Sequence, residues 1–133
     1  MKAGRYISAI LNAAAGVTAI TSNRIYPVMI AQNIPLPAIA YSCTYTPADP
    51  NKTQKETAYL CKATISCWSD SYTQCEDMDL AVNNALNFVE GTTAGVTVTG
   101  CEYQGSEDGI SEDGANDTYK FYRSSTYEIR INR

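Results

Sequence analysis

Five cysteines are the first residues to consider for chemistry, because a thiolate can act as a nucleophile or bind a metal. They stand at Cys43, Cys61, Cys67, Cys75 and Cys101, an odd number without a C-x-x-C pair. This spacing argues against a disulfide framework and a zinc site, and it favours reduced thiols that fill a sheet. Cys75 would lie near a helix N-terminus, but the acidic residues beside it oppose ionisation of the thiol.

The chain contains no histidine. Its absence removes the commonest general base and the usual partner of a serine or cysteine nucleophile. We therefore expect no catalysis, no bound metal and no cofactor. A small thiol-dependent enzyme or a monomeric ligand-binding module remains the alternative from a different functional class.

An acidic segment near the C-terminus contains Ser-Glu-Asp-Gly twice, at 106–109 and 111–114. Carboxylates this close together could converge on a calcium ion, but their spacing differs from that of an EF-hand. We expect instead a mobile, solvated acidic loop from Ser106 to Asp117.

Arginine and tyrosine alternate near the end of the chain, and both residue types are enriched at protein interfaces. The same pattern would suit an edge strand whose charges prevent unwanted pairing, so both interpretations stay open. The candidate interface residues are Arg24, Tyr26, Arg123, Tyr127 and Arg130, with the carboxylates Glu107, Asp108, Glu112 and Asp113.

Length and charge limit the function classes. A chain of 133 residues predicts a single domain, 1–133. The net charge of -4 gives no basic field for holding nucleic acid by its phosphates. No apolar stretch approaches the roughly 20 residues of a membrane-spanning helix, so we expect no membrane partner.

Periodicity predicts the elements that position these residues. Apolar residues from Ile7 to Val17 recur at helical spacing, and so do those from Met78 to Val89. The second helix should begin with a capping box at Ser71 and Gln74, end at Gly91, and carry solvated acidic residues in its first turns, among them Asp79. Strands are predicted over 38–46, 59–68, 95–103 and 118–131, the last two pairing with each other.

The predicted fold class is α+β: a single domain with a mostly antiparallel or mixed β-sheet packed with two α-helices, and a long acidic hairpin loop near the C-terminus. In the strand over 59–68, alternate residues should face the core, from Tyr59 through Cys61, Ala63 and Ile65 to Cys67.

Four segments together resemble the tail-terminator, or tail-completion, proteins of long-tailed bacteriophages. These are Arg24 to Pro27, with the sequence Arg-Ile-Tyr-Pro; Pro35 to Tyr41; the strand end at Trp68; and the last strand, Tyr119 to Ile131. The order and spacing of the pieces carry the resemblance, which covers nearly the whole chain.

The resemblance implies a structural virion protein without enzymatic activity. Such proteins form a ring, commonly a hexamer, that caps the tail tube, stops its polymerisation and provides the joint to the head. The implied partners are further copies of the chain, the major tail tube protein and the head stopper or connector, with DNA only passing through the lumen. The implied location is the head-proximal end of the tail, after assembly in the host cytoplasm. A head-completion or connector subunit of the neck is the alternative within this class.

Overall fold

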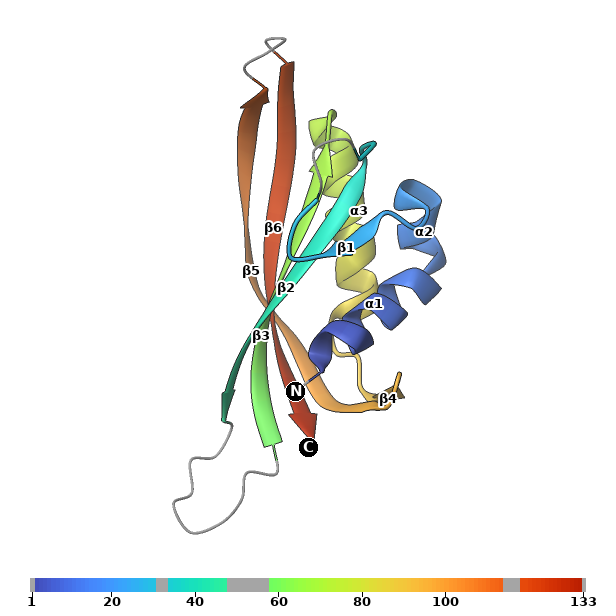
Figure 1. Cartoon of the computed structure of the whole chain (residues 1–133), viewed down its shortest axis with the longest axis vertical. Coiled ribbons are helices and arrows are strands. Elements are labelled where there is room, and N and C mark those ends of the chain that lie inside the picture. Colours follow the sequence, from blue (N-terminus) through green and yellow to red (C-terminus); the bar gives the residue numbers. More distant parts are fainter. Residues whose placement is uncertain (1, 31–33, 48–57, 114–117, 133) are drawn as a thin grey trace.

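The computed structural model describes residues 2–30, 34–47, 58–113 and 118–132. Its elements follow one another as three helices and six strands (Figure 1). They are α1 (Ala3–Ala13), α2 (Ala15–Thr21), β1 (Ile25–Pro27), β2 (Ala38–Pro47), β3 (Ala58–Ser69), α3 (Tyr72–Leu86), β4 (Gly91–Thr93), β5 (Val96–Asp113) and β6 (Thr118–Asn132). The predicted α+β class is confirmed.

All six strands form one sheet in the order β1-β2-β3-β6-β5-β4. Only β1 and β2 are parallel; every other neighbouring pair is antiparallel. The three helices lie on one side of this twisted sheet, and the described part of the chain places no helix on the other side (Figure 1). We call these the helix face and the open face.

The alternation predicted for β3 is confirmed. Cys61, Ala63, Ile65 and Cys67 are fully buried on the helix face, and only Tyr59 remains partly exposed. They pack against α1 and α3 in one core whose largest buried side chains include Tyr6, Ile7, Leu11, Met78, Val82 and Leu86. Because side chains alternate strictly along a strand, this burial fixes the register of the whole sheet.

The N-terminal helix differs from its prediction, because the chain breaks at Ala14. This residue is extended, with φ -82° and ψ 110°, and its carbonyl starts α2 by accepting from Val17 and Thr18. The run of small residues that ends at Gly16 gives this part of the helix little side-chain packing to hold it straight. The break allows Val17 and Thr21 to turn into the core.

Helix α3 is capped as predicted at Ser71, whose hydroxyl accepts from the Gln74 N–H at 3.5 Å. The Gln74 side chain does not close the capping box; it accepts instead from the buried hydroxyl of Ser69 at 2.5 Å. The predicted helix end at Gly91 is wrong, since α3 ends at Leu86. Phe88 then takes a left-handed conformation, φ 64°, and donates its N–H to Cys101 of β5 at 2.8 Å.

The acidic segment is the largest departure from prediction. Residues 106–113 belong to β5 and pair with β6 up to Asp113 opposite Thr118, so the predicted loop over them is wrong. The rest of the predicted loop, 114–117, lies outside the described residues. Composition predicted a loop, but an arginine opposite Asp108 and hydroxyls opposite its neighbours provide cross-strand partners.

Gly109 is one position where the strand requires glycine. The ring of Tyr122, directly across on β6, lies over Gly109 and packs on Trp68 of β3 with ring centroids 4.8 Å apart. A Cβ at position 109 would overlap that ring, so the contact between Trp68 and Tyr122 requires that residue 109 has no side chain.

We expect Gly109→Ala to destabilise the protein by about 1–3 kcal/mol, because the Tyr122 ring must move and lose its contact with Trp68. Gly100→Ala is the matched control in the same strand, since a Cβ there meets nothing within 4 Å. Chemical denaturation of both variants measures the difference. Equal stability of the two variants would contradict this account of Gly109.

Candidate interaction surfaces

The predicted interface residue Arg123 lies on the helix face, where it holds a polar cluster together. Its Nε donates to Asp108 at 2.6 Å and its Nη2 donates to the Tyr72 hydroxyl at 3.1 Å. Tyr72 donates in turn to Asp108 at 2.7 Å, and Nη1 lies 3.7 Å from a carboxylate oxygen of Asp79. Arg123 and Asp108 are therefore partners of each other and join β5, β6 and α3.

Neighbouring charges and hydrogen bonds shift the pKa values in this cluster. Hydrogen bonds from Arg123 and Tyr72 hold the pKa of Asp108 below its ordinary value, and the pKa of Arg123 is raised by the same carboxylate. Asp79, predicted to be a solvated helix-dipole residue, is only 13% exposed at its side chain and accepts from buried Ser125. The sequence pattern of α3 gave no sign of this contact, because its partners come from a strand more than 40 residues later.

The remaining predicted residues are distributed over several surfaces. Tyr127 is fully buried and accepts from Asn83 at 3.3 Å, so it belongs to the core and its place among candidate interface residues is wrong. Arg130 and Glu107 are exposed on the open face. The backbones of Glu112 and Asp113 end β5, and their side chains lie outside the described part of the structure.

The open face is rich in hydroxyl groups along its central strands. Ser66 of β3 and Ser124 of β6 bond across the sheet at 2.9 Å, and a depression of about 420 Å³ lies beside them. Its lining is Thr64, Gly105, Ser106, Glu107, Ser124 and Thr126. The described charged side chains in this face are of both signs: Lys62, Lys120, Arg130, Glu102, Glu107 and Glu128.

Arg24 and Tyr26 lie at the first of the two sheet edges. Each edge is stepped, because a three-residue strand covers only one end of the long strand beside it. The Arg24 Nε donates to Pro37 at 2.9 Å and its carbonyl accepts from Ile39 at 2.9 Å, which docks β1 on the start of β2. Because β1 pairs only with Ile39 to Tyr41, no described strand pairs with the rest of β2, from Ser42 to Pro47, on the side away from β3. This uncovered stretch is the β2 recess.

The second edge has the opposite step. Here β4 pairs only with residues 96–98 of β5, and the chain at Asn87 and Phe88 bonds to Cys101 and Tyr103. From Gly105 to Asp113, no described strand pairs with β5 on the side away from β6. We call this stretch the β5 recess.

Each step carries an exposed apolar residue in a left-handed conformation. Val28, with φ 67°, is 74% exposed and donates its N–H to Tyr41 of β2 at 2.7 Å; Met29 beside it is 70% exposed. Phe88 is 76% exposed at the other edge. A left-handed conformation is costly for β-branched and bulky residues, and such strain concentrates at functional positions. Sequence reasoning missed all three residues, since nothing in their local pattern signals the backbone angle.

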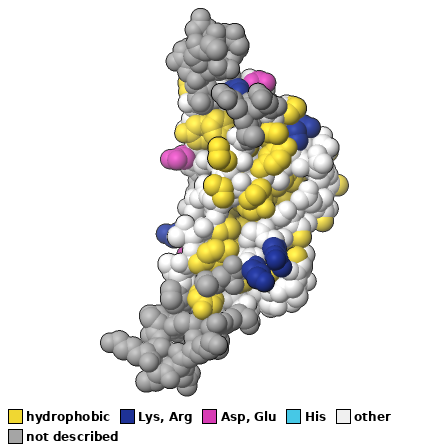
Figure 2. All heavy atoms as spheres, in the orientation of Figure 1, with side chains coloured by type: hydrophobic (Ala, Val, Ile, Leu, Met, Phe, Trp, Pro, Cys, Tyr) yellow, Lys and Arg dark blue, Asp and Glu magenta, His cyan; other side chains and the backbone are white. Residues whose placement is uncertain are grey.

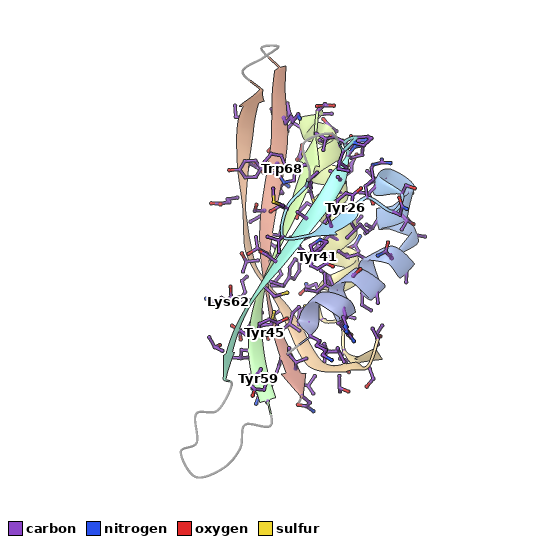
Figure 3. All side chains as sticks on the ribbon, in the orientation of Figure 1. Tyr26, Tyr41, Tyr45, Tyr59, Lys62 and Trp68 are labelled. Atoms are coloured by element: carbon purple, nitrogen blue, oxygen red, sulfur yellow. The ribbon has the colours of Figure 1, made fainter. Side chains whose placement is uncertain are left out.

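A band of tyrosines runs along the first edge. Tyr41, Tyr45 and Tyr59 follow one another down the helix face of β2 and β3, all partly buried (Figure 3). Tyr26 of β1 pairs with Ala40 and lies on the open face. Figure 2 shows hydrophobic side chains crossing this side of the molecule as a diagonal band. The start of α1 closes over the band, where the Tyr45 hydroxyl accepts from the Ala3 N–H at 3.1 Å.

The five thiols are reduced, and four of them are buried. Burial raises the pKa of Cys75 to about 11 and that of Cys101 to about 12. Cys43 differs, because it is partly exposed and a hydrogen bond with Cys61 lowers its pKa to about 7. No group of three or more potential metal-binding His, Cys, Asp or Glu side chains occurs among the described residues. None of the described helices is long and apolar enough to cross a membrane.

No family model matches the chain, and no curated protein matches it either. Its fold is similar to that of a chain in the solved structure of the virion of a native gene transfer agent (GTA) particle, with a TM-score of 0.71. The two chains are 17% identical, and the match covers 98% of this chain and 97% of that chain. At this level of identity the likeness shows a shared fold.

The Arg123 cluster predicts an acid-dependent loss of stability. A carboxyl group with a lowered folded pKa contributes fully above its unfolded pKa, here 3.8, and loses that contribution as the pH falls through the folded value. Asp108→Asn should cost no more than about 1 kcal/mol at pH 7, because the pair is partly exposed and screened. The difference from the parent protein should shrink as the pH falls below 3.8 in urea titrations. Glu107→Gln, on the open face of the same strand, leaves the Arg123 cluster intact and is the control. A difference that persists unchanged into acid would exclude this role for the ion pair.

The thiols differ enough to be ranked by alkylation. With iodoacetamide near pH 7, Cys43 should react first, because it combines partial exposure with the lowered pKa; the buried thiols should follow only on unfolding. Peptide mapping by mass spectrometry identifies the modified residue, and Cys43→Ser should abolish the fast phase. Fast labelling at Cys75 would show that the helix N-terminus activates that thiol after all.

Proposed function

We propose that this chain is a structural protein of a phage-like virion and serves as a tail terminator, a ring that caps the tail tube, stops its polymerisation and forms the joint to the head. The observation that carries the proposal is the fold likeness to a virion chain over 98% of this chain. The match runs nearly end to end in both chains, which supports a virion role for the whole domain.

The segments that resemble tail terminators support the proposal because they form one physical unit. Arg24 to Pro27 and Pro35 to Tyr41 lie more than ten residues apart at their starts, yet they meet as the parallel pair β1 and β2. Trp68 sits beside Ala38 in the next strand, and β6 continues the same sheet. A resemblance spread over the sequence thus corresponds to neighbouring strands.

The open face suits the wall of a DNA channel. Serine and threonine hydroxyls gather at the middle of its central strands, and the described charges of the face include as many acidic as basic groups. A surface of this kind offers DNA no net positive field that would retain it during passage. In the proposed ring the open face therefore lines the lumen, and the helices face outward.

Tail assembly provides the test. Tubes assembled from the cognate tube and tape-measure proteins should end uniformly when this protein is present and should overrun in length when it is omitted, as seen by negative-stain electron microscopy. Labelled protein should appear at one end only. A neck connector would behave differently, since its omission would leave tail length normal and only prevent attachment to heads. Uniform tails without the protein would refute the terminator role.

A further inference from the structure

We propose that copies of this chain join head to tail through the two stepped edges of the sheet. In this contact Phe88 of one copy enters the β2 recess of the next copy, while Val28 and Met29 of that next copy lie against the β5 recess of the first. The inference deepens the proposed function, on which it rests for the closure of the contacts into a ring.

Strand register shows that the two edges are complementary. One row of the sheet runs from Tyr41 through Ile65 and Ser125 to Ser106, so Val28 at Tyr41 stands level with the β5 recess. Another row runs from Tyr45 through Cys61 and Ile129 to Cys101, so Phe88 at Cys101 stands level with the β2 recess. When the two edges meet with their rows in register, each protruding residue faces the gap in the other edge.

The β2 recess has the chemistry to receive an aromatic ring. Tyr45 is partly buried in it and Tyr41 is partly buried at its border with β1, where Gly4 of α1 lets the Tyr41 ring approach to 3.5 Å of where a side chain would begin. Aromatic anchors seated in preformed apolar surfaces carry much of the free energy of protein interfaces. Phe88, held outward by its bond to Cys101, is already in the conformation that such a contact needs.

Charge selects a head-to-tail contact over a two-fold one. The described charged side chains of β5 are all acidic; Asp108 is already paired with Arg123, which leaves Glu102 and Glu107. Those beside the first edge, Lys2, Arg5 and Arg24, are all basic, and the bond from Ala3 to Tyr45 holds the start of α1 against β2. Two copies of the same edge would oppose like charges, whereas unlike edges attract. A heterologous contact of this kind closes into a ring when its rotation closes.

Photo-crosslinking tests the contact directly. A benzoylphenylalanine at position 88, irradiated in concentrated protein mixed with an isotopically labelled copy, should crosslink to residues 41–46 of a second copy. Mass spectrometry separates crosslinks between copies from those within one. Crosslinks to another surface, or none between copies, would overturn the proposal.

Paired variants supply a second measurement. Asparagine tolerates the left-handed conformation, so Phe88→Asn and Val28→Asn should fold normally, and each should weaken self-association about tenfold or more in sedimentation or tail-capping assays. Mixed together, the two variants should form dimers, because each retains the edge that the other lacks. Leu80→Asn removes a similarly exposed side chain, 61%, from α3 away from both edges and should leave association unchanged.

Equal weakening by Leu80→Asn, or no recovery on mixing, would overturn the head-to-tail geometry. These outcomes are independent of the terminator role. Copies crosslinked as expected but absent from tail ends would leave the contact intact and refute the function, whereas tails capped by protein crosslinked elsewhere would do the reverse.

Discussion

One-sided burial of the β3–β6 ladder is the constraint on which the rest of the molecule depends. Twelve residue pairs join these central strands, and every second row is driven into the core by the helices. A slip of β3 by one residue would move Cys61 and Ile65 to solvent and bring Lys62 into the core, at a large cost in free energy. The register thereby fixed decides where every edge residue stands.

The same constraint explains which elements the sequence could predict. Periodic apolar residues in the sequence predict strands β2, β3 and β6 and helix α3. The predicted pairing of β5 with β6 is also confirmed. The break at Ala14 and the early end of α3 are backbone events whose reasons lie in distant contacts. Local sequence patterns do not predict such contacts.

The acidic strand shows the limit most clearly. Residues 106–113 have the composition of a solvated loop, yet they are ordered by partners that arrive from β6 and α3. The same holds at the candidate surfaces: Arg123 and Asp108 are predicted as interface residues from their charge and position, and nothing in the sequence indicates that they bond to each other. Val28 and Phe88 could be recognised only after their backbone angles and exposure were known.

The unequal covering of the two sheet edges has a consequence for polarity. Since β1 shields one end of its edge and β4 shields the opposite end of the other, the molecule cannot be turned upside down in a row of its own copies without losing the fit. Any closed assembly built on these edges points all its members the same way, so its upper and lower rims expose different atoms. Two different partner proteins could then bind such a ring, one at each rim, without competing for the same surface.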